Sequence, residues 1–130
     1  MTVELRILTY SVILGIVHVI AASHLISNQY GYAWTAGMRE KEMPILTGVA
    51  GRVDRAFTNF LETFPFFAAV VLIASVLARH NALTIRGAYL YVTGRIAYVV
   101  LYAMGFGLLR SLVWNVALAG ITLFLIAILI

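Results

Sequence analysis

Four long blocks of apolar residues run along the chain, separated by shorter segments that are polar or contain glycine. They cover about residues 7–26, 60–78, 83–104 and 108–130. Each block has about 20 residues, the length of helix that crosses the hydrocarbon core of a bilayer. A backbone in lipid must satisfy its hydrogen bonds internally, so each block is expected to be a helix. The pattern predicts an all-α membrane protein with four spanning helices.

The segments between the blocks predict how these helices are arranged. A polar turn at residues 79–81 and a glycine-containing break at residues 105–107 are too short to let the chain cross the membrane again. Neighbouring helices must therefore run antiparallel. The one long link, about residues 27–49, is polar and must lie in water or among lipid headgroups. We expect residues 1–130 to form one domain, a four-helix bundle whose first and third links share a side of the membrane.

Composition supports lipid as the solvent and excludes some functions. The chain is 63% hydrophobic and 11% charged, whereas a soluble domain has about 25% charged residues. The net charge is +4, but Lys and Arg are scattered singly between apolar blocks, so nucleic-acid binding is not expected. The three histidines are equally scattered, so no metal site is expected. Without cysteine, any thiol chemistry must use a thiol from another molecule.

Two features of the chain ends and links leave alternatives open. The first block follows Arg6 and precedes a run of small residues, a pattern that a cleavable signal peptide also shows. The block is long for such a core, and Glu4 balances Arg6, so a membrane helix is favoured. The membrane side that holds the long link and the 105–107 break has five Lys and Arg residues, counted with the adjoining helix ends, against three on the other side. This bias favours a cytoplasmic position for the long link.

A polar stripe enters the second apolar block. With about 100° per residue, Arg52, Arg55, Asn59 and Glu62 fall within an arc of about 80° on one helix face, and Asp54 lies off that arc. A charged side chain inside a bilayer costs several kcal/mol, so it normally faces protein or a water-filled cavity. The stripe therefore indicates an inward face. It either holds the helices together through hydrogen bonds or forms a ligand site.

The third block repeats the pattern with Arg95, Tyr98 and Tyr102, which share an arc of about 60°. Arg95 lies near the middle of the block, too deep for its charge to reach the membrane surface easily. Glu62 is the only carboxylate inside any of the four apolar blocks. We therefore expect Arg95 and Glu62 to be close, within one chain or across a subunit contact.

Further polar and aromatic residues have less specific interpretations. Arg110 and Ser111 open the fourth block, and an arginine at a helix start opposes the helix dipole. That conflict suggests a role for Arg110 beyond stabilising the helix. His18, midway along the first block, is interpreted as a hydrogen-bonded packing residue rather than a ligand or proton carrier. Membrane-surface anchoring is the expected role of several aromatic residues, namely Tyr10, Tyr30, Tyr32, Trp34 and Trp114.

The polar stripe resembles the second-helix signature of the MAPEG family, the membrane-associated proteins of eicosanoid and glutathione metabolism. That signature reads R-x-x-R-A-x-x-N-x-x-E-x-x-P, and every specified position is present. The matching residues are Arg52, Arg55, Ala56, Asn59, Glu62 and Pro65. The third-helix run from Gly94 to Tyr102 and the pair Arg110-Ser111 also look like family positions. The resemblance covers nearly the whole chain and is nearest to bacterial members.

The resemblance implies a homotrimer with glutathione bound between adjacent subunits. Arg110 would stabilise the glutathione thiolate, with Ser111 beside it. Arg39 in the long link would match a further glutathione-binding arginine. The remaining positions that the resemblance assigns to glutathione binding are Arg52, Arg55, Asn59, Glu62, Arg95, Tyr98 and Tyr102. A lipophilic electrophile would enter sideways from the bilayer, and a bacterial inner membrane is the implied location.

Several functions are compatible with the sequence. The favoured hypothesis is a glutathione-dependent membrane transferase or peroxidase. An alternative is a non-catalytic membrane protein that binds glutathione or a lipid, because a shared fold does not prove catalysis. A small carrier that uses Arg95, Glu62 and His18 and a purely structural bundle are further alternatives.

Overall fold

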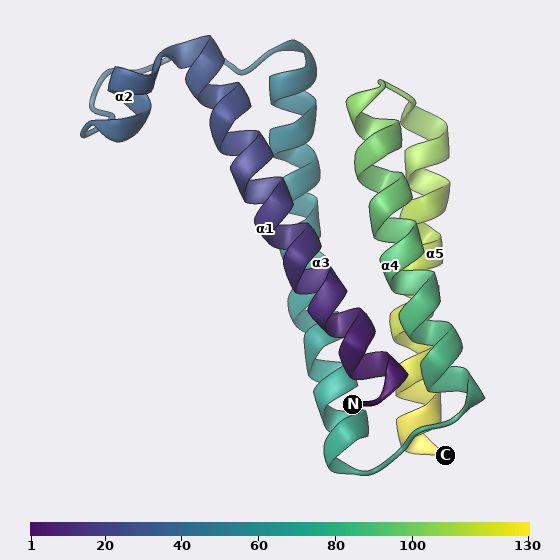
Figure 1. Ribbon diagram of the computed structural model, residues 1–130. Coiled ribbons are helices and arrows are strands. Elements are labelled where there is room, and N and C mark those ends of the chain that lie inside the picture. The colour runs from purple at the N-terminus through teal and green to yellow at the C-terminus, as the bar shows by residue number, and fades with distance from the viewer.

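The computed structural model describes residues 1–130 and contains helices and links but no strands (Figure 1). This confirms the all-α fold class. Four of the five helices are long, and α2 is a single short turn within the long link. In chain order the helices are α1 (Val3–Tyr30), α2 (Tyr32–Ala36), α3 (Gly48–Val76), α4 (Ala82–Ala103) and α5 (Gly107–Leu129).

The long helices follow the four apolar blocks, but two of them extend further than predicted. α1 begins at Val3, where the side chain of Thr2 caps it by accepting from Leu5 N. α3 begins at Gly48, well before the expected start near residue 60. The reason is that the polar stretch before the block is itself helical. As a result, the whole polar stripe lies on one continuous helix.

Three helices are long and apolar enough to cross a membrane, namely α1, α3 and α5. The chain is therefore an integral membrane protein. α4 has 22 residues, but Arg86, Arg95 and four tyrosines lower its hydropathy. Part of that polarity is hidden from lipid, since Tyr91 and Arg95 are 0% and 1% exposed. The expected fourth span, α4, is therefore not among the helices that length and composition identify.

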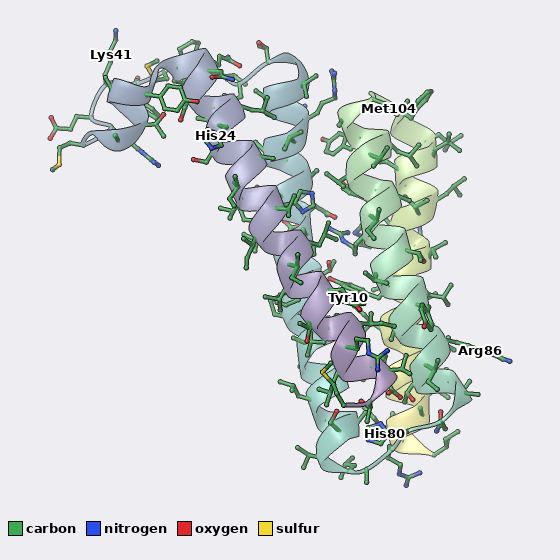
Figure 2. All side chains as sticks on the ribbon, in the orientation of Figure 1. Tyr10, His24, Lys41, His80, Arg86 and Met104 are labelled. Carbon is green, nitrogen blue, oxygen red and sulfur yellow. The ribbon has the colours of Figure 1, made fainter.

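The two short links and the long link lie where the sequence predicts. In Figure 2, Met104 at the end of α4 lies at the same end of the molecule as His24 and Lys41, and His80 and Arg86 lie at the other end. We call these the link end and the termini end, since both chain termini lie at the latter (Figure 1). The helix pairs α1–α3 and α4–α5 converge toward the termini end and diverge toward the link end.

Glycines bring α4 and α5 into close contact along their length. A Cβ atom added at Gly87 would lie 2.6 Å from the Gly120 carbonyl oxygen, and one added at Gly94 would lie 2.9 Å from the Val113 carbonyl oxygen. Only glycine permits such an approach of two backbones, and small residues are the usual means by which membrane helices associate. α4 and α5 therefore form one tightly joined hairpin.

The apolar core lies toward the termini end, where the helix pairs meet. Phe67 of α3 stacks on Tyr91 of α4 with ring centroids 3.8 Å apart, and Phe124 of α5 meets Phe67 edge-on at 6.0 Å. All three side chains are fully buried. Ile7 adds α1 to the same cluster. This core fixes the termini end, and the polar stripe of α3 lies nearer the link end.

A carboxylate outside the predicted apolar blocks is buried at the termini end. Glu4 lies outside the predicted block 7–26, yet it belongs to α1 and is 2% exposed. It accepts a hydrogen bond from Thr84 Oγ1 at 2.6 Å and pairs with His80 Nδ1 at 3.5 Å. Glu62 is the only carboxylate inside the four predicted apolar blocks, and the longer helices of the structure also include Glu4 and Asp54. The Glu4 cluster, defined as Glu4, His80 and Thr84, ties α1 to the start of α4.

Candidate functional site

The polar stripe of α3 faces α4, as its helical arc predicts for an inward face. Arg52 Nε donates to the Ala103 carbonyl oxygen at 3.0 Å, and Arg55 Nε donates to the Tyr102 hydroxyl at 2.8 Å. Ala103 ends α4, so Arg52 meets the partial negative charge of a helix C-terminus. Neither arginine forms a salt bridge. Both cations are held by neutral or dipolar groups of α4.

Deeper in the stripe, Asn59 links Arg95 to Glu62. Arg95 Nη1 donates to Asn59 Oδ1 at 2.9 Å, and Asn59 Nδ2 donates to Glu62 Oε2 at 3.1 Å. No salt bridge joins Arg95 to Glu62 within the chain, so the expected closeness takes the form of an amide relay. The relay fixes which way the Asn59 amide points and thereby orients the Glu62 carboxylate.

Arg95 itself is enclosed by aromatic rings. Its guanidinium carbon lies 4.8 Å from the Tyr98 ring centre and 5.6 Å from that of Phe60. The side chain is 1% exposed, and Nε and Nη2 have no hydrogen-bond partner. Direct contact between Arg95 and a ligand stays a prediction. What the structure places within its reach is Asn59.

Arg110 reaches the same region from α5. The turn after α4 passes through Gly105 with φ +89°, a conformation that suits glycine, and α5 starts two residues later. The guanidinium carbon of Arg110 then lies 4.4 Å from the Tyr102 ring centre, and Nη1 makes a long hydrogen bond of 3.4 Å to the Tyr98 hydroxyl. Its Nε is buried without a partner. Arg55 also lies against the Tyr102 ring, at 5.7 Å.

A polar cavity of about 180 Å³ opens beside Arg110. It combines one cation with hydroxyl, amide and indole groups. Its lining residues are Asn59, Tyr98, Arg110, Ser111, Trp114 and Asn115. Ser111 is exposed and donates its hydroxyl to the Gly107 carbonyl oxygen at 3.2 Å. The cavity therefore brings together residues from α3, α4 and α5 that are far apart in sequence.

An apolar groove of about 410 Å³ lies next to this cavity, between α3 and α5. Trp114 lines both spaces, and Glu62 stands at the edge of the groove. The groove residues are Glu62, Thr63, Phe66, Trp114, Leu118 and Ile121. A polar cavity and an apolar groove that share one wall can hold an amphipathic ligand.

Arg39 does not join the other arginines within the chain. Its backbone has φ +57°, Nε donates to the Thr35 carbonyl oxygen at 2.9 Å, and the guanidinium lies 5.7 Å from the Trp34 ring centre. It lines a separate cavity of about 220 Å³ together with Asp54. Asp54 falls off the polar stripe of α3, so Arg39 lies on a different side of that helix.

The charges of the site are unbalanced. The structure contains one salt bridge, between Glu4 and His80 at the termini end. Four arginines at the link end, Arg52, Arg55, Arg95 and Arg110, have no carboxylate in salt-bridge contact. Glu62 is the carboxylate on the same stripe, and it is exposed and bonded to Asn59, whereas Asp54 of α3 lies off the stripe in the cavity with Arg39. A site of this kind is suited to an anionic ligand.

Two residues that line the cavity lie outside the set that the sequence predicts for the site. The sequence favours membrane anchoring for Trp114 and gives no role to Asn115. The spacing of Trp114 from Arg110, i and i+4, places both on one helix face and is the signal that could have found it.

His18 is 4% exposed and packs against Phe57 and Phe60, with neither ring nitrogen hydrogen-bonded.

These features define an integral membrane protein with an arginine-rich site at one end of its helices. The sequence matches the model of the MAPEG family over residues 7–130, nearly the whole chain. The chain therefore belongs to the MAPEG family. No curated protein and no solved structure matches it. Membership suggests a glutathione-related function in the membrane, since MAPEG proteins generally use glutathione and are generally trimers.

Proposed function

We propose that this protein is a glutathione-dependent membrane transferase or peroxidase that acts on lipophilic electrophiles or lipid hydroperoxides. The observation that carries the proposal is the excess of positive charge at the link end, where four arginines lack a carboxylate partner. Glutathione supplies two carboxylates and one ammonium group. Guanidinium groups bind carboxylates through two parallel hydrogen bonds, and a carboxylate such as Glu62 suits the ammonium.

Each residue of the stripe has a role that follows from its position. Arg52 and Arg55 are held at one guanidinium nitrogen by α4, and their remaining N–H groups would bind the tripeptide carboxylates. Glu62, held by Asn59, would bind the ammonium. Tyr98 and Tyr102 would contact the tripeptide through their hydroxyls. Arg95 is buried, and its contribution would pass through Asn59.

Arg110 is proposed to activate the thiol. A free thiol is mostly protonated near neutral pH, and a nearby cation lowers its pKa by stabilising the thiolate. Arg110 can supply this positive charge without losing a proton of its own, because guanidinium stays charged in proteins. Its buried Nε has no partner in the chain and is available to a sulfur or oxygen atom. Ser111 would provide a second donor beside it.

The cavity size supports a site completed by a second subunit. The polar cavity holds about 180 Å³, whereas sites for small organic ligands usually hold about 300–1,000 Å³. Glu62 and Arg55 are also exposed in the single chain. We therefore propose a homotrimer of four-helix subunits, with α4 spanning the bilayer beside α5 and the tripeptide bound at the seam. Arg39 would reach that seam from a neighbouring subunit.

The proposed membrane is a bacterial inner membrane, with the link end toward the cytoplasm. The charge bias of the links supports this orientation. It would expose the glutathione site to the compartment that contains reduced thiols, and the apolar groove would open toward lipid.

Titration of the purified protein with glutathione tests the proposal. The thiolate absorbance and the release of protons should both rise as glutathione is added. Arg110→Ala should retain most of the glutathione binding and lose at least nine-tenths of the thiolate signal, and Arg86→Ala, an exposed arginine at the termini end, should behave as wild type. If the wild type binds glutathione without any thiolate signal, the transferase hypothesis is rejected in favour of the non-catalytic glutathione-binding protein.

A further inference from the structure

Trp114 occupies the boundary between the polar cavity and the apolar groove. It lies one helical turn beyond Arg110 on α5, and its ring is half-buried. Residues of the polar cavity lie on one side of it, and Phe66, Leu118 and Ile121 of the groove lie on the other. A hydrocarbon ligand that enters the groove from lipid therefore contacts Trp114 before it reaches Arg110.

The indole N–H of Trp114 is buried and has no acceptor in the chain. The chain's other tryptophan provides a comparison, since Trp34 Nε1 donates to the Lys41 carbonyl oxygen at 2.8 Å. A buried donor without an acceptor costs about 1–3 kcal/mol. An acceptor that arrives with a ligand would recover this free energy. An indole is a donor only, so the matching group must be an acceptor such as a carbonyl oxygen.

We propose that Trp114 donates a hydrogen bond to the carbonyl oxygen of a long-chain α,β-unsaturated ketone or aldehyde, and that this contact selects the electrophile. The inference rests on the proposed function for the thiolate at Arg110. The hydrocarbon chain lies along Phe66, Leu118 and Ile121, and the reactive end reaches the polar cavity. Trp114 is then a catalytic residue, because it touches the atom on which charge develops.

The reaction is an addition without net oxidation or reduction. The thiolate sulfur forms a bond to the β-carbon, and the electron pair of the carbon–carbon double bond moves to the carbonyl oxygen. The resulting enolate oxygen accepts the hydrogen bond from Trp114. A proton from water then joins the α-carbon and restores the carbonyl. A donor that binds the oxygen more strongly as it becomes negative stabilises the transition state more than the substrate.

Proton–nitrogen NMR of the indole groups tests the contact independently of catalysis. The probe is undecyl methyl ketone, which has a carbonyl but no double bond, added to the full chain in lipid nanodiscs. The Trp114 indole resonance, assigned by its loss in Trp114→Phe, should move downfield, and the Trp34 resonance should stay in place. Tridecane should produce no such shift. An unmoved Trp114 resonance at saturating ketone, or an equal shift with tridecane, overturns the proposal.

Kinetics test the selectivity. Trp114→Phe keeps an aromatic ring and removes the donor. We expect kcat/KM for a long-chain methyl enone to fall about tenfold, because the carbonyl oxygen loses its hydrogen-bond donor, and kcat/KM for undecyl iodide, whose reacting centre has no oxygen, to change less than twofold. Trp34→Phe should match the wild type. Equal losses on both substrates would reject the donor role, and the thiolate absorbance in the same samples reports separately on the proposed function.

The occupant of the groove is tested through a single cysteine. The chain has none of its own, so Leu118→Cys introduces a unique label site. A lipophilic maleimide should react with it, and undecyl methyl ketone should slow that reaction. Formation of a disulfide between two subunits at this position, with no protection by the ketone, would show that a second copy of the chain fills the groove and would overturn the proposal.

Discussion

The two polar clusters of this protein differ in how their charges are balanced. At the termini end, the buried carboxylate of Glu4 has a hydroxyl donor and a histidine partner within the chain. At the link end, Arg52, Arg55 and Arg110 meet only neutral oxygens and aromatic rings. The first cluster needs nothing from outside, and the second lacks its counter-charges. The difference distinguishes a cluster that holds helices together from one that binds a ligand.

The largest expected effect is the loss of a cation at the link end. Arg55→Ala removes an exposed guanidinium that has no carboxylate partner, so the fold should lose little. Glutathione affinity should fall tenfold or more, since a hydrogen bond to a charged group contributes about 1.5–3 kcal/mol. Calorimetry measures the affinity, and a thermal melt measures the stability. Arg86→Ala is the matched control. A lower melting temperature of Arg55→Ala with unchanged glutathione affinity would show that Arg55 stabilises the fold and does not bind the ligand.

The opposite effect is expected at the termini end. Glu4→Ala removes the acceptor of the Thr84 hydroxyl and the partner of His80, which should lower the free energy of unfolding by about 1–3 kcal/mol. Glutathione affinity should stay within twofold. Glu4→Gln, which keeps an oxygen acceptor for Thr84, should lose less than half as much. Equal losses of unfolding free energy in both variants would assign the stabilisation to the charge of Glu4. A large loss of glutathione affinity would show that the Glu4 cluster affects the site at the link end.

A smaller effect is expected when the link end is given an internal anion. Asn59→Asp places a carboxylate beside Arg95 and Glu62, so the added charge would pair with Arg95 and repel the Glu62 carboxylate. Glutathione affinity should fall about fivefold, roughly 1 kcal/mol, and the melting temperature should stay constant or rise. Asn28→Asp on α1 serves as the control. Unchanged affinity would show that the orientation of Glu62 does not matter for binding.

The sequence predicts much of the fold because lipid imposes strong constraints on it. The apolar blocks locate the four long helices, and the arc of Arg52, Arg55, Asn59 and Glu62 identifies the inward face of α3 from residue spacing alone. Helical spacing is sufficient there because all four residues lie on one helix. The polar turn and the glycine break likewise locate two of the links.

The contacts between helices were harder to predict. Glu4 lies outside an apolar block, and its burial depends on Thr84, 80 positions away. Arg95 was expected beside Glu62, but the intervening Asn59 amide depends on how α3 and α4 face each other. Arg39 was grouped with the other arginines through the family resemblance, although the path of the long link carries it to another side of α3. Pairing across helices depends on three-dimensional packing that periodicity does not contain.

Because glycine contacts join α4 and α5 closely, the residues of the site belong to two separate parts of the structure, the α4–α5 hairpin and α3. Tyr98, Tyr102, Arg110 and Trp114 all belong to the α4–α5 hairpin, whose backbones are too close to slide independently. The residues that would hold the peptide carboxylates and ammonium belong to α3. A bound tripeptide would therefore hold α3 and the α4–α5 hairpin together. These two parts are already joined at the termini end by the aromatic core. Ligand-dependent motion would be greatest at the link end, where they diverge.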